Sequence, residues 1–89
     1  MKKHEVLEEA GRLISEDRQS QYGKATDNFG RIAEMWSAYA GINFTKSDVA
    51  AMMALMKLAR LANQHKDDSW IDLAGYAALG AELAEEDNV

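Results

Sequence analysis

The sequence predicts an all-α fold, a four-helix bundle-like domain that is completed by association with further copies of the chain. Three observations support this. Apolar residues recur three and four positions apart along four stretches, the spacing of one face of an α-helix. The chain contains no proline to interrupt a helix. Its 89 residues suffice for a single domain, residues 1–89. The hydrophobic core of so short a domain would be small unless other subunits extended it.

The first predicted helix spans residues 3–20. Its apolar stripe consists of Val6, Ala10, Leu13 and Ile14. Glutamates occupy the first turns, where the helix dipole stabilises negative charge. We expect the helix to stop near Tyr22-Gly23, because glycine readily takes the left-handed conformation that ends helices.

The second predicted helix spans residues 27–40, with Thr26 or Asp27 as its cap. Its stripe consists of Phe29, Ile32, Ala33, Trp36 and Ala40. A connection beginning at Gly41 follows. In this connection Phe44 is expected to tuck inward just before the next cap, Thr45.

The third predicted helix spans residues 47–63 and starts with a capping box at Thr45 to Asp48. From Val49 to Met56 no polar residue occurs on any face. A surface helix has a polar side, so this pattern predicts a helix that is buried all round. Four short helices do not easily surround one of their own number. We therefore predict a homo-oligomer in which a second subunit covers the remaining face.

The fourth predicted helix spans residues 69–86 and begins at a second capping-box pattern, Ser69 to Asp72. Glycine inside a helix costs about 1 kcal/mol relative to alanine. Gly75 and Gly80 therefore indicate a close approach by a neighbouring helix or by a ligand.

Composition excludes several classes of function. A net charge of −5 disfavours binding to duplex DNA or RNA. The absence of cysteine excludes disulfides and thiolate metal sites, and the two histidines match no metal-binding spacing. No apolar run approaches the roughly 18 residues of a membrane span, and the acidic start is unlike a signal peptide. We predict a cytoplasmic protein with no membrane contact.

A local cationic patch interrupts the acidic chain. No acid occurs between Asp48 and Asp67, whereas Lys57, Arg60 and two further bases fall there. Lys57 and Arg60 are three residues apart and so share one helix face. A lysine beside the planar fork of an arginine suits a phosphate group.

The last two helices are expected to pack antiparallel, because the turn between them is short. If the chain reverses near residue 66, Lys57 is level with Tyr76 and Arg60 with Asp72. Asp68 and Asp72 are then candidate ligands for Mg²⁺, which retains several waters in protein sites. Alternatively, Arg60 and Asp72 form an ordinary ion pair, or Asp72 only caps its helix.

Aromatic side chains supply candidate stacking surfaces for a ligand ring. Tyr22 could stack on a base while Lys24 and Asn28, at the start of the next helix, meet a phosphate. Trp70 and Tyr76 are further candidates. The structural alternative is that tyrosine with glycine merely ends a helix and that the aromatic rings fill the core.

Several blocks of the sequence resemble a phage-encoded family of small helical proteins with no assigned function. They are Tyr22-Gly23, Asn28-Phe29, Ile32-Ala33 with Trp36, Lys57 to Arg60 and Asp68 to Ala77, within residues 16–84. More remotely, the chain is similar to the nucleotide-modification-associated relatives of MazG-like nucleotide pyrophosphohydrolases. That resemblance implies a helical, oligomeric, magnesium-dependent enzyme that cleaves nucleoside triphosphates to monophosphates.

The chain departs from the enzyme pattern in its acids. MazG-like enzymes bring a Glu-Glu-x-x-Glu cluster on one helix to a Glu-x-x-Asp pair on the next. Here the first of these helices has no carboxylate after Asp48, and Ser69 stands in place of the glutamate, so that only Asp72 is retained. Metal-assisted cleavage needs carboxylates to hold the ion and activate water. We therefore expect binding rather than hydrolysis.

Three hypotheses follow. The leading one is a phage-type protein that binds or sequesters a nucleotide or nucleotide-derived signal between helices or subunits, in the host bacterial cytoplasm, and so counteracts antiviral signalling. The second is a MazG-like pyrophosphohydrolase, which would require Mg²⁺ at Asp68 and Asp72. The third is a structural or adaptor protein without a small ligand.

Overall fold

The computed structural model describes residues 1–87, the side chain of Asp17 excepted, and these residues are helical apart from short connections. The helices are α1 (Lys3–Arg12), a π-helical turn (Leu13–Asp17), α2 (Arg18–Tyr22), α3 (Ala25–Ala40), α4 (Lys46–Asn63) and α5 (Asp67–Asp87). The predicted all-α class is confirmed, and the predicted boundaries agree to within about two residues.

The first predicted helix is continuous but not regular. The π-helical turn at Leu13–Asp17 separates α1 from α2. Such turns are rare and occur often at functional sites. The helix ends as predicted, because Gly23 takes a left-handed conformation with φ of 77° and its N–H donates to the Gln19 carbonyl.

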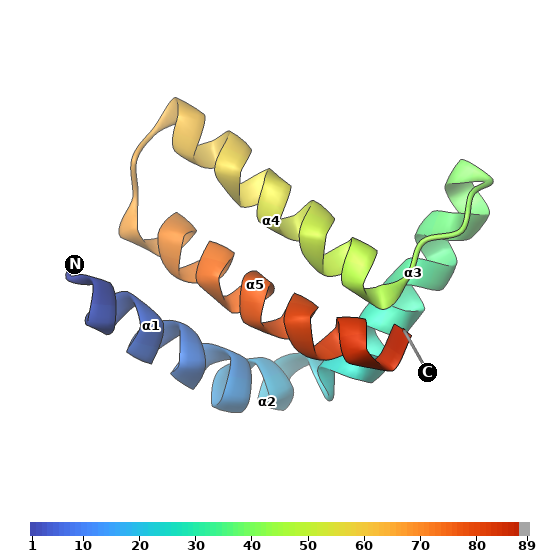
Figure 1. Ribbon diagram of the computed structural model, residues 1–89, viewed down its shortest axis with the longest axis horizontal. Helices are drawn as coiled ribbons and strands as arrows, with labels where there is room; N and C mark the ends of the chain where they lie inside the picture. The colour runs from blue at the N-terminus through green and yellow to red at the C-terminus, as the bar shows by residue number, and fades with distance from the viewer. Residues whose placement is uncertain (88–89) are drawn as a thin grey trace.

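The helices are arranged around α5 (Figure 1). In this view α5 lies between α4 on one side and α1–α2 on the other, and it contacts both α4 and α1. Residues 64–66 join α4 to α5 in an antiparallel pair. Helix α3 crosses at the end where α4 begins and α5 finishes, and its carboxyl-terminal half projects past them.

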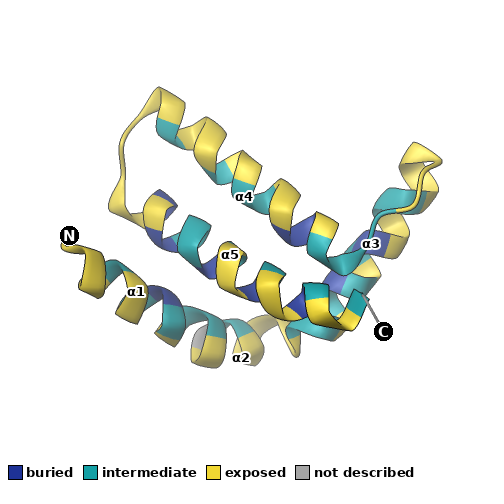
Figure 2. Ribbon diagram, in the orientation of Figure 1, coloured by how far each residue is buried: buried dark blue, intermediate teal, exposed yellow. Residues whose placement is uncertain are grey.

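Further buried residues follow α5 and α1, and the main core cluster lies at this crossing (Figure 2). It consists of Phe29, Ala33, Val49, Ala50, Leu79 and Leu83. Phe29 and Val49 are fully buried. The two glycines of α5 allow close approach, as predicted. A Cβ at Gly75 would lie 3.1 Å from Ile14 Cγ2, and one at Gly80 would lie 3.2 Å from Ala50 Cβ.

The predicted caps are confirmed in part. At Thr45 the capping box is complete, since its hydroxyl accepts from Asp48 N–H at 3.1 Å and its own N–H donates to the Asp48 carboxylate at 2.9 Å. The cap predicted at Thr26 or Asp27 is wrong for both residues. Helix α3 starts earlier, after Lys24, and the Thr26 hydroxyl donates to Glu86 at 2.7 Å instead.

The start of α5 also differs from the prediction. The helix begins at Asp67, so Ser69 is buried within the first turn and does not cap it. Phe44 is half-buried and lies beside Trp36, which packs against the core. Its ring meets that of Trp36 edge-on, with 6.4 Å between centroids.

Helix α4 is not buried on all sides within one copy of the chain. Of the stretch without polar residues, only its first two residues, Val49 and Ala50, are buried. We define the outer face of α4 as Ala51, Met52, Leu55, Leu58, Ala59 and Ala62, all of which are exposed. That a second subunit covers this face stays a prediction. Within residues 1–87, none of the helices combines the length and apolar content needed to cross a bilayer.

Candidate functional site

A groove of about 640 Å³ opens where the last turns of α4 meet the first turns of α5. We call it the α4–α5 groove. Its lining residues are Met56, Lys57, Ala59, Arg60, Asn63, Gln64, Lys66, Asp68, Ser69 and Asp72. The antiparallel turn thus gathers three cations and two carboxylates, and it brings together five residues that sequence reasoning singled out: Lys57, Arg60, Asp68, Ser69 and Asp72.

Lys57 is the most enclosed charge in the groove, with 13% of its side chain exposed. Its Nζ lies 2.9 Å from Asp72 Oδ2. The predicted alignment placed Lys57 level with Tyr76 and Arg60 with Asp72. The observed pairing differs by about one helical turn, because the chain reverses earlier than residue 66 and α5 starts at Asp67.

Arg60 projects from the rim of the groove and is exposed. Among the described residues no carboxylate forms an ion pair with it, since Asp72 is taken by Lys57. A guanidinium without an internal partner keeps its planar set of donors available to a ligand. With Lys57 and Asp72 paired, Arg60 and Lys66 outweigh Asp68, so the lining of the groove has a net positive charge.

The carboxylates of the groove are few. Asp68 and Asp72 both line it, as the predicted magnesium site requires. However, Asp72 already neutralises Lys57, and the described part of the chain contains no group of three metal-binding side chains. Mg²⁺ at these residues would rely mainly on water and on ligand phosphates.

Two of the predicted stacking residues lie outside the lining of the groove. The ring of Trp70 packs against His65, with 5.9 Å between centroids, and its Nε1 lies 3.5 Å from His65 Nδ1. Tyr76 is half-buried on α5, one turn after Asp72, with its ring centroid 6.4 Å from that of Phe29.

The remaining candidates lie at the junction of α2 and α3. Tyr22 and Lys24 are exposed and line a separate, shallow depression together with Arg31. Asn28 is half-buried in the first turns of α3. The structure therefore does not bring the whole predicted set together. The α4–α5 groove contains Lys57, Arg60, Asp68 and Asp72.

Arg18 was not singled out from the sequence. Its guanidinium carbon lies 4.7 Å from the ring centroid of Phe29, 5.2 Å from that of Tyr22 and 6.0 Å from that of Tyr76. Its Nε is buried and has no hydrogen-bond partner among the described residues. The only sequence signal was the spacing of four between Arg18 and Tyr22, which is too common to stand out.

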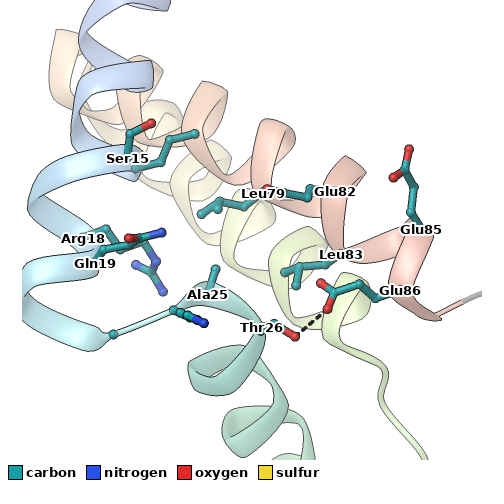
Figure 3. A pocket seen from close by; sticks show the side chains of 13 residues that line it. Ser15, Arg18, Gln19, Ala25, Thr26, Leu79, Glu82, Leu83, Glu85 and Glu86 are labelled. Atoms are coloured by element: carbon teal, nitrogen blue, oxygen red, sulfur yellow. Dashed lines mark hydrogen bonds between the residues drawn. The ribbon is translucent and has the colours of Figure 1, made fainter.

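Arg18 also lines a second cavity, of about 710 Å³, which is shown in Figure 3. Ser15, Gln19 and Thr26 lie on one side, and α5 contributes Glu82, Glu85 and Glu86 on the other. These three acids outnumber the two bases of the lining, Arg18 and Lys24. The charges of the α4–α5 groove therefore attract a polyanionic ligand more than those of this cavity do.

The chain is similar to proteins of two mycobacterium phages. It is 43% identical over 76 residues to the Gene 55 protein of Mycobacterium phage L5, covering 83% of this chain and 49% of that protein. It is 42% identical over 82 residues to the Gene 55 protein of Mycobacterium phage D29, covering 91% and 54%.

The chain thus spans about half the length of these curated relatives. No solved structure matches it. Residues 5–84 match the family described as a domain of unknown function, DUF6378. This match covers nearly all of α1 to α5 and includes every residue of the α4–α5 groove. The chain therefore belongs to the DUF6378 family.

Proposed function

We propose that this chain binds a nucleotide or a nucleotide-derived signal in the α4–α5 groove and holds it intact. The observation that carries the proposal is the convergence of Lys57, Arg60 and Lys66 on one groove of a protein whose net charge is −5. In this proposal Arg60 and Lys66 bind the phosphates. Lys57 would join them by exchanging its bond to Asp72 for one to the ligand.

The size of the groove supports a small ligand. About 640 Å³ falls within the roughly 300–1,000 Å³ typical of small-molecule sites. Asn63, Gln64 and Ser69 add neutral donors and acceptors to the lining, which suit the hydroxyls of a ribose. Trp70 lies next in sequence to Ser69, is partly exposed and is the nearest candidate for stacking on a base.

The acids of the groove favour binding over hydrolysis. Metal-assisted cleavage of a phosphoanhydride needs carboxylates to hold the ion and to activate water. The groove has two, and Asp72 is paired with Lys57. A phage protein that retains a nucleotide without cleaving it would lower the free concentration of that nucleotide in the host cytoplasm. We propose sequestration of a host signal as its role.

The test is incubation with a panel of nucleoside mono-, di- and triphosphates and cyclic nucleotides, with and without Mg²⁺, followed by chromatography. Depletion of a ligand that returns unchanged when the protein is denatured supports the proposal. Release of pyrophosphate would instead show the MazG-like activity. If every nucleotide of the panel remains unbound and intact, the result would favour an adaptor protein without a small ligand.

Variants connect binding to the groove. A hydrogen bond to a charged group is worth about 1.5–3 kcal/mol, so Arg60→Ala should weaken binding roughly tenfold or more. Lys57→Ala should weaken it as well. The matched control is Lys3→Ala with Arg31→Ala, which removes the same charges from exposed positions outside the groove. Equal affinities for the control and the groove variants would reject the site.

We also propose that the chain acts as a homo-oligomer. The support is the outer face of α4, which presents six apolar side chains and no charge to solvent. Contiguous exposed apolar surface on a helix commonly marks an interface.

A further inference from the structure

The apolar residues of the outer face of α4 are distributed symmetrically about Leu55. Ala51 and Ala59 are four residues before and after it, and Met52 and Leu58 are three before and after it. Leu55 itself has 62% of its surface exposed. Residues three and four apart share a helix face, so these five side chains form one stripe with a large residue at its centre.

A stripe of this kind is complementary to itself. If two copies of α4 pack antiparallel about a two-fold axis through Leu55, Ala51 meets Ala59 of the second copy and Met52 meets Leu58. Leu55 then meets its own counterpart. Two-fold interfaces use one patch on both subunits and require such self-complementarity. The paired alanines allow the two helices to approach closely.

The charges at the two ends of α4 favour the same orientation. Asp48, at the amino-terminal end, is exposed and lies on the helix face of Leu55, since the two are seven residues apart. Glu86 and Asp87 lie beside this end, where Asp87 accepts a hydrogen bond from Ser47 N–H. Arg60 and Lys66 stand at the carboxyl-terminal end. Antiparallel packing brings the acidic end of one copy to the end of the other that carries Arg60 and Lys66 together with Asp67 and Asp68, whereas parallel packing would place the two acidic ends against each other.

Helix α3 supplies the additional area that such a contact needs. A stable interface buries roughly 800 Å² per partner, which is more than one helix stripe provides. The projecting end of α3 carries Met35, Tyr39 and Ile42, all exposed, with Tyr39 at 95%. Figure 1 shows this end on the side of α4 opposite to α5. A second copy seated on the outer face would lie against it.

We propose that the outer face of α4 is a two-fold interface with a second copy of this chain, in which the α4 helices run antiparallel and cross at Leu55. The projecting end of each α3 packs beside the carboxyl-terminal half of α4 in the other copy. Ala59 belongs to both the interface and the lining of the α4–α5 groove, so the second copy borders each groove. The interface does not require that the groove hold a nucleotide.

Cysteine cross-linking tests the geometry directly, because the chain has no native cysteine. Leu55→Cys should form a disulfide-linked dimer on mild oxidation, since it lies on the axis. Ala51→Cys alone should not, but a mixture of Ala51→Cys and Ala59→Cys should link. Self-linking of Ala51→Cys as efficient as that of Leu55→Cys would indicate parallel helices and overturn the proposal.

Light scattering without any ligand tests the association itself. Wild-type protein should have the mass of a dimer, and Leu55→Lys should be monomeric with an unchanged helical circular dichroism spectrum. The matched control is Leu7→Lys on α1, whose leucine is equally exposed at 67% and which should remain dimeric. A monomeric wild-type protein would overturn the proposal and leave this face to a different partner. The cross-linking and light-scattering experiments do not depend on nucleotide binding. Failure of the interface can therefore be distinguished from failure of the nucleotide site.

Discussion

At the scale of single residues, the charges of the α4–α5 groove are only partly balanced. Lys57 is held by Asp72 at 2.9 Å, while Arg60 has no carboxylate partner among the described residues. An anionic ligand can therefore bind Arg60 at once, whereas it can bind Lys57 only after that lysine has separated from Asp72. Asp72 therefore determines how much of the positive charge a ligand can use.

We predict that Asp72→Asn strengthens nucleotide binding several-fold. The substitution removes a negative charge that repels phosphate and frees Lys57 from its ion pair. Titration calorimetry at constant ionic strength measures the effect, with Asp27→Asn, an exposed aspartate on α3, as the control. If Asp72 instead holds Mg²⁺ for catalysis, the variant would bind more weakly when Mg²⁺ is present.

Sequence reasoning identified the residues of the groove but not their pairing. The helical spacing of Lys57 and Arg60 and the antiparallel turn sufficed to predict that bases and acids meet. The pairing depends on where α5 begins. Asp67 starts the helix two residues before the predicted cap, Ser69. A difference of two residues at a turn exchanges Arg60 for Lys57 as the partner of Asp72.

At the scale of elements, the regular helices were predictable and the irregular turn was not. Apolar spacing and the Thr45 capping box fixed α3, α4 and α5 closely. Nothing in residues 13–17 predicts the π-helical turn, which packs against α5 in the folded chain. The same packing places Arg18 among three aromatic rings.

We predict that Arg18→Met leaves the free energy of unfolding nearly unchanged or raises it. Methionine keeps the apolar contacts with Phe29 and Tyr22 and removes a buried Nε that lacks a hydrogen-bond partner. Arg18→Ala should destabilise the protein, because it removes those contacts too. Urea unfolding compares the two variants. Equal destabilisation by both would show that the guanidinium itself stabilises the fold.

The contact between the end of α5 and the start of α4 should make stability depend on pH. Hydrogen bonds, chiefly from the Ser47 hydroxyl and then from the N–H groups of Ser47 and Lys46, lower the pKa of Asp87 below its usual range. A carboxyl with a lowered pKa in the folded state contributes stability above its unfolded pKa and loses it as the pH falls. Asp87 therefore stabilises the protein at neutral pH and not in strong acid.

Asp87→Asn should accordingly lower the stability at neutral pH and flatten its decrease on acidification. Urea unfolding at a series of pH values measures both changes. Glu85→Gln, an exposed acid on the same helix, serves as the control. An unchanged slope for Asp87→Asn would show that this contact does not contribute to the acid sensitivity.

At the scale of the whole molecule, the core and the candidate site occupy opposite ends. The core lies where α3 crosses α4 and α5, and the α4–α5 groove lies where α4 ends and α5 begins. Spacing along the chain could not show this separation. It grouped Tyr22 and Lys24 with Lys57 by residue type, whereas the fold places them in separate depressions.

The same separation allows a phosphate site to be located experimentally, because bases occur in two separate places on the protein. One is the α4–α5 groove, and the other is the cavity beside Arg18 and Lys24. The backbone amides near each site are far apart in sequence, residues 56–72 for the first and residues 15–26 for the second. A titration observed residue by residue therefore distinguishes them.

The decisive measurement is the change in backbone amide chemical shifts when the nucleotide selected by the binding panel is added to isotopically labelled protein. We predict that the largest changes fall within residues 56–72 and are lost in the Arg60→Ala variant. Changes centred on residues 15–26, or changes that persist in Arg60→Ala, would contradict a phosphate site between α4 and α5.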